Sequence, residues 1–271
     1  MVHEWMFLGS GNSQSPDLGN AAAVWLSDGK PRLLVDCGWS VPQLWQRDFD
    51  ALPPAIFLTH VHMDHCAGLE SWYYQLAVAA ENGNPQPLLK LFCPAELVPL
   101  LQQRLGSYPE ALAEGGSNFW DVFQLIPVHR QFWLDGIRCE VFPTRHHRPN
   151  SAFGLAVPGL FFYSGDTRPI PEWVTALAGA GETIFHDAGL SGNPAHTGIE
   201  DLVREYSQGQ RERMVLYHLE NESAVQQAEA AGYRVARPGD VFDLGRHGQA
   251  TTHSSHPASA QEPRSKDPGP A

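Results

Sequence analysis

Short apolar runs recur along the chain, each ended by small or polar residues, and helical patterns follow several of them. This order is typical of an α/β protein in which helices pack over sheets. Residues 55–59 (Ala-Ile-Phe-Leu-Thr) form the clearest predicted strand, because a nearly continuous apolar run is expected of a strand that is buried on both faces. Further strands are predicted over 6–8, 21–26, 33–35, 88–92, 121–128, 131–134, 137–143, 152–157, 160–164 and 213–217.

Helical patterns lie between these strands. The first is ended by residues 81–85, which contain Gly and Pro, and Gly232 stands where a left-handed cap usually closes the last one. Residues 106–118 are expected to form a surface loop. The predicted helices span 66–80, 94–105, 199–207 and 223–231.

Three of the predicted strands end at residues that can bind metals or move protons. These residues are His60, Asp166 and His218. In a layered α/β fold, loops converge and ligands bind at the C-terminal ends of the strands. We therefore expect the three side chains to meet at one edge of the fold.

One folded domain is expected over residues 1–245, because 271 residues of which 42% are hydrophobic can bury a substantial core. The remaining residues, 246–271, are rich in Ser, His, Pro and Gln, and we predict that this tail is disordered. The chain has no uninterrupted apolar stretch of about 18 residues and no basic leader followed by an apolar one. These features predict a soluble, cytoplasmic protein with no membrane partner.

The charge balance is acidic, with 18 Lys and Arg against 30 Asp and Glu and a net charge of −12. A long polyanion would be attracted poorly, so the chain has no strong nucleic-acid footprint, and a small phosphodiester or ester is the easier substrate. A local basic patch could override the overall charge. Arg145, Arg148 and Arg168 are close in sequence to the candidate site described next.

The segment His60-Val61-His62-Met63-Asp64-His65 carries the strongest chemical signal. Residues two apart in an extended loop point to the same side, so His60 and His62 can hold one ion while Asp64 and His65 turn toward a second. Imidazole and carboxylate ligands suit zinc, manganese or iron. The four cysteines form no C-x-x-C pair, which argues against a closed structural zinc site and favours reduced, buried thiols.

The H-x-H-x-D-H pattern resembles the signature of the metallo-β-lactamase superfamily, and the resemblance extends to about residue 245. It implies a four-layer αββα sandwich with two divalent cations at the edge between the sheets, zinc being the expected metal and manganese or iron the alternatives. It also implies that Asp36 supports the metal-binding loop and that Asp166 bridges the ions. The implied ligands are His60, His62, Asp64, His65, Asp166, His218 and one histidine of the pair at 146 and 147.

The adjacent histidines His146 and His147 cannot both face one ion from the end of a strand. Strand register, and the reach to residues 151–154, which the superfamily often carries after this ligand, favour His146. His147 remains the alternative ligand, and otherwise contacts substrate or solvent.

Two further segments resemble the ribonuclease Z branch of the superfamily. In that branch an acidic residue and a following histidine form a pair beside the scissile phosphate, and Asp187 and His196 occupy these positions. The acidic residue is aspartate here, where glutamate is usual, so the match is partial. Enzymes of this branch that process tRNA use a basic arm, and the nearest candidate for such an arm here is the segment 106–118, which is short and acidic. This difference favours a smaller phosphodiester as substrate, either a cyclic one or one at an RNA end.

The resemblance implies a hydrolytic mechanism in which a hydroxide bridging two cations attacks phosphorus in line. His196, oriented by Asp187, would stabilise the developing charge and protonate the leaving oxygen. Asp64 belongs to the same catalytic group, where we expect it to hold a metal rather than act as a free base.

Three other interpretations stay open. A hydrolase of thioesters, lactones or β-lactams could use the same hydroxide, and the Asp187–His196 pair is the one sequence feature that separates it from a phosphodiesterase. An iron-containing redox relative is disfavoured because no flavin or sulfur-handling motif is visible. A non-catalytic binding module is disfavoured because every expected ligand position is filled. Many members of the superfamily are dimers, and a homodimer is an open expectation because no association motif is legible.

Overall fold

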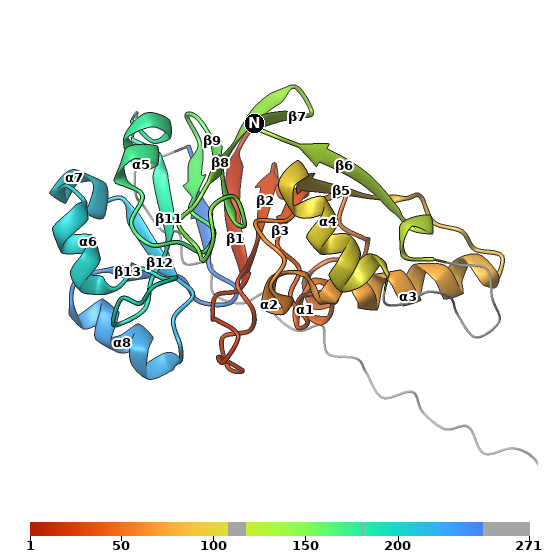
Figure 1. Ribbon diagram of the computed structural model, residues 1–271, viewed down its shortest axis with the longest axis horizontal. Coiled ribbons are helices and arrows are strands. Elements are labelled where there is room, and N and C mark those ends of the chain that lie inside the picture. Colours follow the sequence, from red (N-terminus) through yellow and green to blue (C-terminus); the bar gives the residue numbers. More distant parts are fainter. Residues whose placement is uncertain (108–117, 180, 246–271) are drawn as a thin grey trace, which may run out of the picture.

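Two sheets of seven strands each form the centre of the computed structural model, which describes residues 1–107, 118–179 and 181–245. Helices α1 to α4 lie beside the first sheet, and helices α5 to α8 lie beside the second (Figure 1). The described residues therefore form the four-layer αββα sandwich that the sequence predicts.

The first sheet has the strand order β14-β1-β2-β3-β4-β5-β6. It is mixed, because β14, β1, β2 and β3 pair antiparallel while β3, β4, β5 and β6 pair parallel. Its strands are β1 (His3–Gly9), β2 (Ala22–Ser27), β3 (Lys30–Val35), β4 (Ala55–Phe57), β5 (Leu89–Pro94), β6 (Phe123–Val128) and β14 (Val241–Asp243).

The second sheet has the order β13-β12-β11-β10-β9-β8-β7. Strands β7 to β10 pair antiparallel, and β10 to β13 pair parallel. Its strands are β7 (Gln131–Leu134), β8 (Ile137–Pro143), β9 (Phe153–Val157), β10 (Phe161–Tyr163), β11 (Thr183–Asp187), β12 (Met214–Tyr217) and β13 (Arg234–Val235).

The helices are short, and the longest described one is α3. Within the described residues, every helix is too short or too polar to span a bilayer. The helices are α1 (Val41–Asp48), α2 (Met63–Cys66), α3 (Gly68–Glu81), α4 (Val98–Leu101), α5 (Pro171–Leu177), α6 (Ile199–Glu205), α7 (Gln208–Arg211) and α8 (Glu222–Ala230), with 3-10 turns at Ala95–Leu97 and Phe119–Asp121 and a π-helical segment at Gln102–Gly106.

The space between the two sheets is filled by aromatic side chains. Trp5 of the first sheet packs on Phe161 and Phe185 of the second, with ring centroids 4.4 and 5.2 Å apart, and all three are fully buried. Large aromatic side chains contribute much of the apolar area in such a core. This packing fixes the two sheets against each other and so fixes the relative positions of their strand ends.

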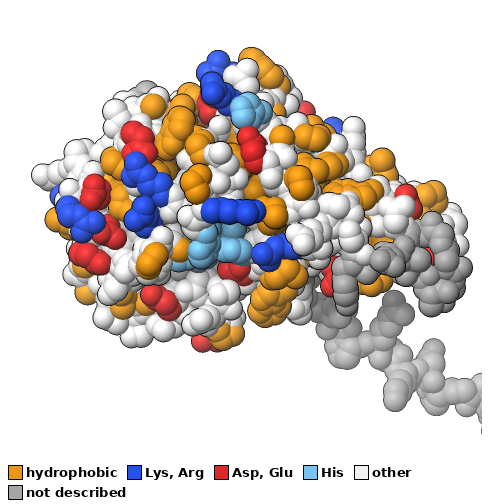
Figure 2. Space-filling model, in the orientation of Figure 1, with side chains coloured by type: hydrophobic (Ala, Val, Ile, Leu, Met, Phe, Trp, Pro, Cys, Tyr) orange, Lys and Arg blue, Asp and Glu red, His pale blue; other side chains and the backbone are white. Residues whose placement is uncertain are grey.

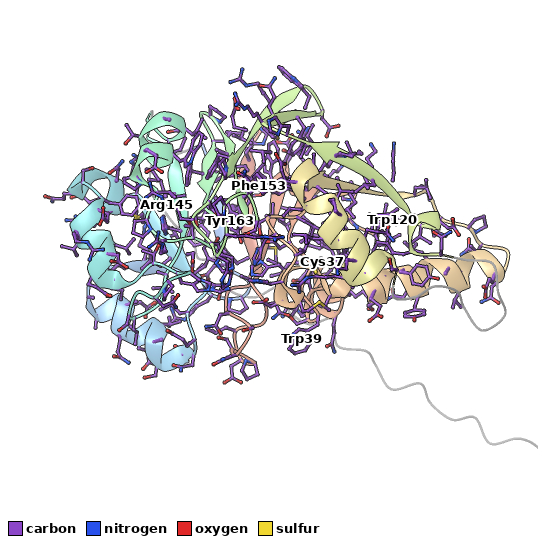
Figure 3. All side chains as sticks on the ribbon, in the orientation of Figure 1. Cys37, Trp39, Trp120, Arg145, Phe153 and Tyr163 are labelled. Atoms are coloured by element: carbon purple, nitrogen blue, oxygen red, sulfur yellow. The ribbon has the colours of Figure 1, made fainter. Side chains whose placement is uncertain are left out.

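Residues with metal-binding or acid–base side chains follow the strand ends. His60 follows β4 and Asp36 follows β3 in the first sheet, while Asp166 follows β10 and His218 follows β12 in the second. Figure 3 shows Tyr163 of β10 and Cys37 beyond β3 near the middle of the molecule, where ends of strands from both sheets meet. Asp166 Oδ2 lies 3.6 Å from His60 Nε2 and 3.4 Å from His218 Nε2, so the expected convergence of these three residues is confirmed.

Two predicted helices differ in the structure. The helix expected over 66–80 begins at Gly68, because the Gly68 N–H donates to Cys37 O at 2.9 Å instead of continuing the turn that starts at Met63. The helix expected over 94–105 is divided into a 3-10 turn, α4 and a π-helical segment. Pro99 explains one boundary, since a residue without an N–H is tolerated in the first turn of a helix.

Several elements were not predicted, among them α1, α5, α7, β11, β13 and β14. Of the loop expected over 106–118, Gly106 belongs to the π-helical segment, Asn118 caps a 3-10 turn, and 108–117 lie outside the described residues. The tail predicted to be disordered, 246–271, also lies outside them.

Candidate metal centre

The segment after β4 presents its first two histidines toward one point. His60 forms an antiparallel bridge with Ala152, and His62 is still extended, at φ −70° and ψ 151°, before the turn α2 begins. His60 Nε2 and His62 Nδ1 consequently lie 3.0 Å apart. The spacing of two residues in an extended segment thus places both nitrogens on one side, as the sequence predicts.

The loop after β8 brings a third histidine to the same point. His146 Nε2 lies 3.2 Å from His62 Nδ1, and its ring is almost fully buried. His147, at φ 56°, is exposed and lies outside the groups of side chains that could hold an ion. The His147 ring also lies beside His62, with centroids 5.1 Å apart, but of the two adjacent histidines His146 is the one whose nitrogen joins the group of His60 and His62.

A second group of side chains lies beside the first. His65 Nε2 and His218 Nε2 lie 3.6 and 3.9 Å from Asp64 Oδ2. Asp166 Oδ2 lies 3.4 Å from both of these histidine nitrogens, and it is 3.6 Å from His60 Nε2. Asp166 thus stands between the two groups, at the position expected of a bridging carboxylate.

These separations fit divalent cations. Ligands at 2.0–2.1 Å from a tetrahedral zinc ion are about 3.3 Å from one another, and the distances above lie near that value. His65 Nε2, His218 Nε2 and Asp166 Oδ1 are buried without a hydrogen-bond partner among the described residues. Buried polar atoms normally have partners, so a shared set of orphaned atoms is what a pair of metal ions would satisfy.

The ring nitrogens that face away from the two groups have partners of their own. The His65 Nδ1 atom lies 2.8 Å from Asp36 Oδ2, and His146 Nδ1 lies 3.0 Å from the carbonyl oxygen of Ala195. His60 Nδ1 lies 3.0 Å from Thr59 Oγ1. Such contacts fix the orientation of metal-binding histidines.

Asp36 anchors the loop as a whole. The Thr59 N–H and hydroxyl donate to its two oxygens at 2.8 and 2.7 Å, in addition to the contact with His65. Burial raises the pKa of Asp36, although His65 opposes the shift. The supporting role predicted for Asp36 therefore has a clear geometry.

The first group favours neutral imidazole. Burial, reinforced by the neighbouring His65 ring, holds the pKa of His60 well below its usual value. Burial and the nearby His146 ring lower the pKa of His62 to about 4. A neutral ring keeps the lone pair that a metal ion requires.

The second group is held by opposite charges. Burial alone would lower the pKa of His218, but Asp166, together with contacts to Asp187 and Asp64, raises it to about 10. Burial alone would raise the pKa of Asp64, but His218 and His65 lower it to about 2. The carboxylates of this group are therefore ionised and favour positive charge, and a cation held there would replace the proton on His218.

Asp187, at the end of β11, contacts two histidines. Its Oδ2 atom lies 2.9 Å from His196 Nδ1, and its Oδ1 atom lies 3.4 Å from His218 Nδ1. The Thr167 N–H also donates to Oδ2, at 2.8 Å. Burial lowers the pKa of His196, but the Asp187 carboxylate outweighs it and the net pKa is raised. His196 is 24% exposed, and one of its ring nitrogens lies within 4.8 Å of ligand atoms of Asp166 and His218, so it lies at the edge of the second group.

A cavity of about 360 Å³ opens on both groups. Five of the seven candidate ligands line it, together with His147, His196, Glu220 and residues of the segments 12–14 and 187–193. An adjoining cavity of about 330 Å³ is lined by Arg104, Arg148 and His147. Figure 2 shows histidine side chains on this face with basic side chains directly beside them.

Some residues that shape this site were not identified from the sequence. Thr59 directly precedes His60, and its position at the end of a predicted strand could have identified it as a residue of the site. The Ala195 carbonyl and Glu220 lie next to the predicted residues His196 and His218, but a backbone carbonyl and a single glutamate gave no signal of their own. Cys66, beside His65, is a buried thiol whose pKa is raised by burial to about 12, and the other three cysteines are also buried and free.

Solved structures share this fold at low sequence identity. The metallo-β-lactamase fold protein YhfI from Bacillus subtilis aligns with a TM-score of 0.69 and 13% identity, over 90% of this chain and 100% of its own. A diphosphatase of the PhnP family aligns with a TM-score of 0.68 and 18% identity, over 89% and 97%. Human tRNase Z, short form, aligns with a TM-score of 0.60 and 19% identity, over 89% and 99%. The metallo-β-lactamase fold is confirmed, and with the clustered histidines and aspartates it supports a metal-dependent hydrolase.

The sequence relatives identify the family of the chain, whereas the solved structures identify its fold. The family described as "Anti-Pycsar protein Apyc1" matches residues 3–242. The protein of that name from Saccharibacillus brassicae is 30% identical over 207 residues, which cover 72% of this chain and 81% of the relative. The one from Bacillus phage 010DV004 is 29% identical over 239 residues, covering 79% and 88%. The chain therefore belongs to the family of the anti-Pycsar protein Apyc1.

Proposed function

We propose that this protein is a phosphodiesterase that uses two divalent cations and acts on a small phosphodiester, either a cyclic nucleotide or an RNA end. The observation that carries the proposal is the Asp187–His196 pair, which lies beside two ligand groups that share Asp166. The same site contains cation ligands and a separate proton donor, which are the parts that phosphodiester hydrolysis requires.

The chain's residues divide into two ligand sets in this proposal. His60, His62 and His146 would hold the first cation and Asp64, His65 and His218 the second, with Asp166, which lies beside both sets, available to either. When bound, the cations supply the Lewis acidity that lowers the pKa of water and polarises the phosphoryl group. Zinc is the metal we favour, and a zinc-bound structure of PqqB from Methylobacterium extorquens with this fold supports that choice.

His196 is the proposed acid. Asp187 contacts its Nδ1 atom, which fixes the ring and leaves Nε2 for the substrate. The Asp187 carboxylate raises the pKa of His196 and so favours the protonated ring, which can stabilise the developing charge and give a proton to the leaving oxygen. Asp187 also lies against His218, so one carboxylate positions both the acid and a proposed metal ligand.

A phosphorus centre is favoured over a carbonyl centre by this acid. The leaving alkoxide of an unactivated phosphodiester needs a proton, and the site holds one at His196, outside the two ligand sets just assigned. A diphosphatase and a tRNase Z among the proteins of the same fold also support a phosphorus substrate. Arg104 and Arg148 in the adjoining cavity are the observation that keeps an RNA end as the second candidate.

Metal titration tests the proposal. Protein stripped with a chelator should not hydrolyse bis(p-nitrophenyl) phosphate, and activity should return as zinc or manganese is added, reaching a plateau at about two equivalents. His62→Ala should lower the number of equivalents bound. Full activity in chelator, or restored metal content without any phosphodiester hydrolysis, would contradict the proposal.

A further inference from the structure

Glu220 is an acidic residue in the main cavity that the proposed mechanism does not use. It lies two residues beyond His218, and neither of its carboxylate oxygens has a hydrogen-bond partner among the described residues; Oε2 is buried, so Oε1 is the oxygen that a ligand in the cavity can reach. The other acidic side chains that line this cavity, Asp64, Asp166 and Asp187, all contact histidines of the centre. Glu220 therefore requires a separate explanation.

The position of Glu220 is fixed by its backbone. Ser15 Oγ donates to the carbonyl oxygens of Leu219 and Glu220 at 2.8 and 2.6 Å, and the Asn12 N–H donates to the Leu219 carbonyl at 3.3 Å. On the other side, Glu220 Oε1 lies 3.1 Å from the point where a Cβ on Gly189 would stand. Glycine at 189 thus leaves the carboxylate room against the loop, and the carboxylate is held in the wall of the cavity.

An unpartnered carboxylate oxygen has a definite chemical preference. It can only accept hydrogen bonds, so it binds a donor group of a ligand and disfavours an anionic one. Among the described residues, no Lys or Arg lines this cavity, so Glu220 has no cationic partner there. The Glu220 carboxylate would also repel a second phosphate of a substrate, because no Lys or Arg side chain in the described cavity lining offsets its charge.

We propose that Glu220 accepts a hydrogen bond from a hydroxyl or N–H group of the substrate, and that it selects the neutral, donor-bearing nucleoside part of a substrate with a single phosphodiester. This inference rests on the proposed phosphodiesterase function and adds a specificity residue to it. Glu220 touches the substrate away from the phosphate. Its contribution therefore appears in the binding of nucleotides and is absent for phosphodiesters without a donor.

The test compares zinc-loaded wild-type protein with Glu220→Gln. The control is Glu222→Gln, because Glu222 pairs with Arg237 at the surface of α8. The substrates are 3′,5′-cyclic AMP, its 2′-deoxy analogue and bis(p-nitrophenyl) phosphate, which carries no hydrogen-bond donor. Glu220→Gln should lower kcat/KM for cyclic AMP by roughly tenfold or more, mainly through KM. The rate on bis(p-nitrophenyl) phosphate and the zinc content should stay unchanged.

The deoxy analogue identifies the donor. If the 2′-hydroxyl donates, wild-type protein loses activity on the analogue and Glu220→Gln has no further effect on it; if a base N–H donates, the effect of Glu220→Gln persists. Either result supports the proposal. Equal losses on cyclic AMP and bis(p-nitrophenyl) phosphate, or no loss on cyclic AMP, would overturn it.

Calorimetry with adenosine 5′-monophosphate keeps this test separate from the proposed function. If wild-type protein hydrolyses no phosphodiester, the phosphodiesterase proposal fails, yet the affinity for the nucleotide can still be compared between the two proteins. Weaker binding by Glu220→Gln supports the recognition role. Equal affinity, or no binding by either protein, overturns it.

Discussion

The Oδ2 atom of Asp187 lies 2.9 Å from the Nδ1 atom of His196, and the carboxylate is fully buried while the imidazole reaches the cavity. The buried partner fixes the ring, and the exposed edge faces the place where a substrate binds. This asymmetry fits the proposed acid, whose ring a buried carboxylate orients, although His196 also lies close to the candidate ligands Asp166 and His218.

Substituting His196 by Ala should leave the metal content intact while slowing cleavage of an unactivated phosphodiester by about 100-fold or more, because one acid and one charge-stabilising donor are removed. The loss should be smaller for bis(p-nitrophenyl) phosphate, whose leaving group needs little protonation. Steady-state rates on the two substrates measure this difference. Unchanged activity on both substrates would show that His196 takes no part.

Metal affinity should depend on Asp36, although this carboxylate belongs to neither ligand group. Asp36 holds both Thr59 and His65, so Asp36→Asn should weaken zinc binding by about 10- to 100-fold, as is usual for partners of metal-binding histidines. Asp135→Asn is the matched control, because Asp135 is an exposed partner of Arg32. Competition with a chelator gives both affinities, and equal values would refute the supporting role.

The adjacent histidines should behave differently. His146→Ala should abolish activity and remove metal from the first site, because its Nε2 atom converges with the ring nitrogens of His60 and His62. His147→Ala should keep the metal and at most weaken substrate binding, since His147 lines both cavities from an exposed position. Metal analysis of the two variants distinguishes the two histidines. Loss of metal in His147→Ala but not in His146→Ala would identify His147 as the ligand.

Stability should depend on the aromatic contact between the sheets. Trp5→Ala should lower the free energy of unfolding by about 3–5 kcal/mol, because it removes a fully buried side chain that packs on Phe161 and Phe185. Trp39→Ala should change it by less than about 0.5 kcal/mol, since Trp39 is 61% exposed. Denaturant unfolding gives both values, and similar losses would contradict the assignment of the core.

The parts of the fold that could be predicted from the sequence are those with a strong local pattern. The apolar run of β4 and the histidines directly after it lie within a few residues of each other, so the predicted strand and the convergence of His60 with His62 both agree with the structure. Helix α5 was missed, although Pro171 stands at its start, where proline is favoured. It is short and buries few residues, so its periodicity is weak.

Contacts between distant segments could not be predicted in the same way. Asp187 and His196 were paired through a resemblance, but the second contact of Asp187, with His218, depends on the parallel pairing of β11 and β12. Glu220 reaches the cavity because the segment around Asn12 and Ser15 bonds to the backbone beyond His218. No spacing within the sequence encodes either relationship.

The most direct test of the proposed function is the ratio of kcat/KM values for phosphodiesters and carbonyl substrates, measured on one zinc-loaded preparation. The substrates are 3′,5′-cyclic AMP and a short RNA with a 3′ extension, against a thioester, a lactone and a β-lactam. We predict that a phosphodiester has the highest kcat/KM of the set. A higher value for any of the carbonyl substrates would contradict it and would leave only a metal-dependent hydrolase of this fold.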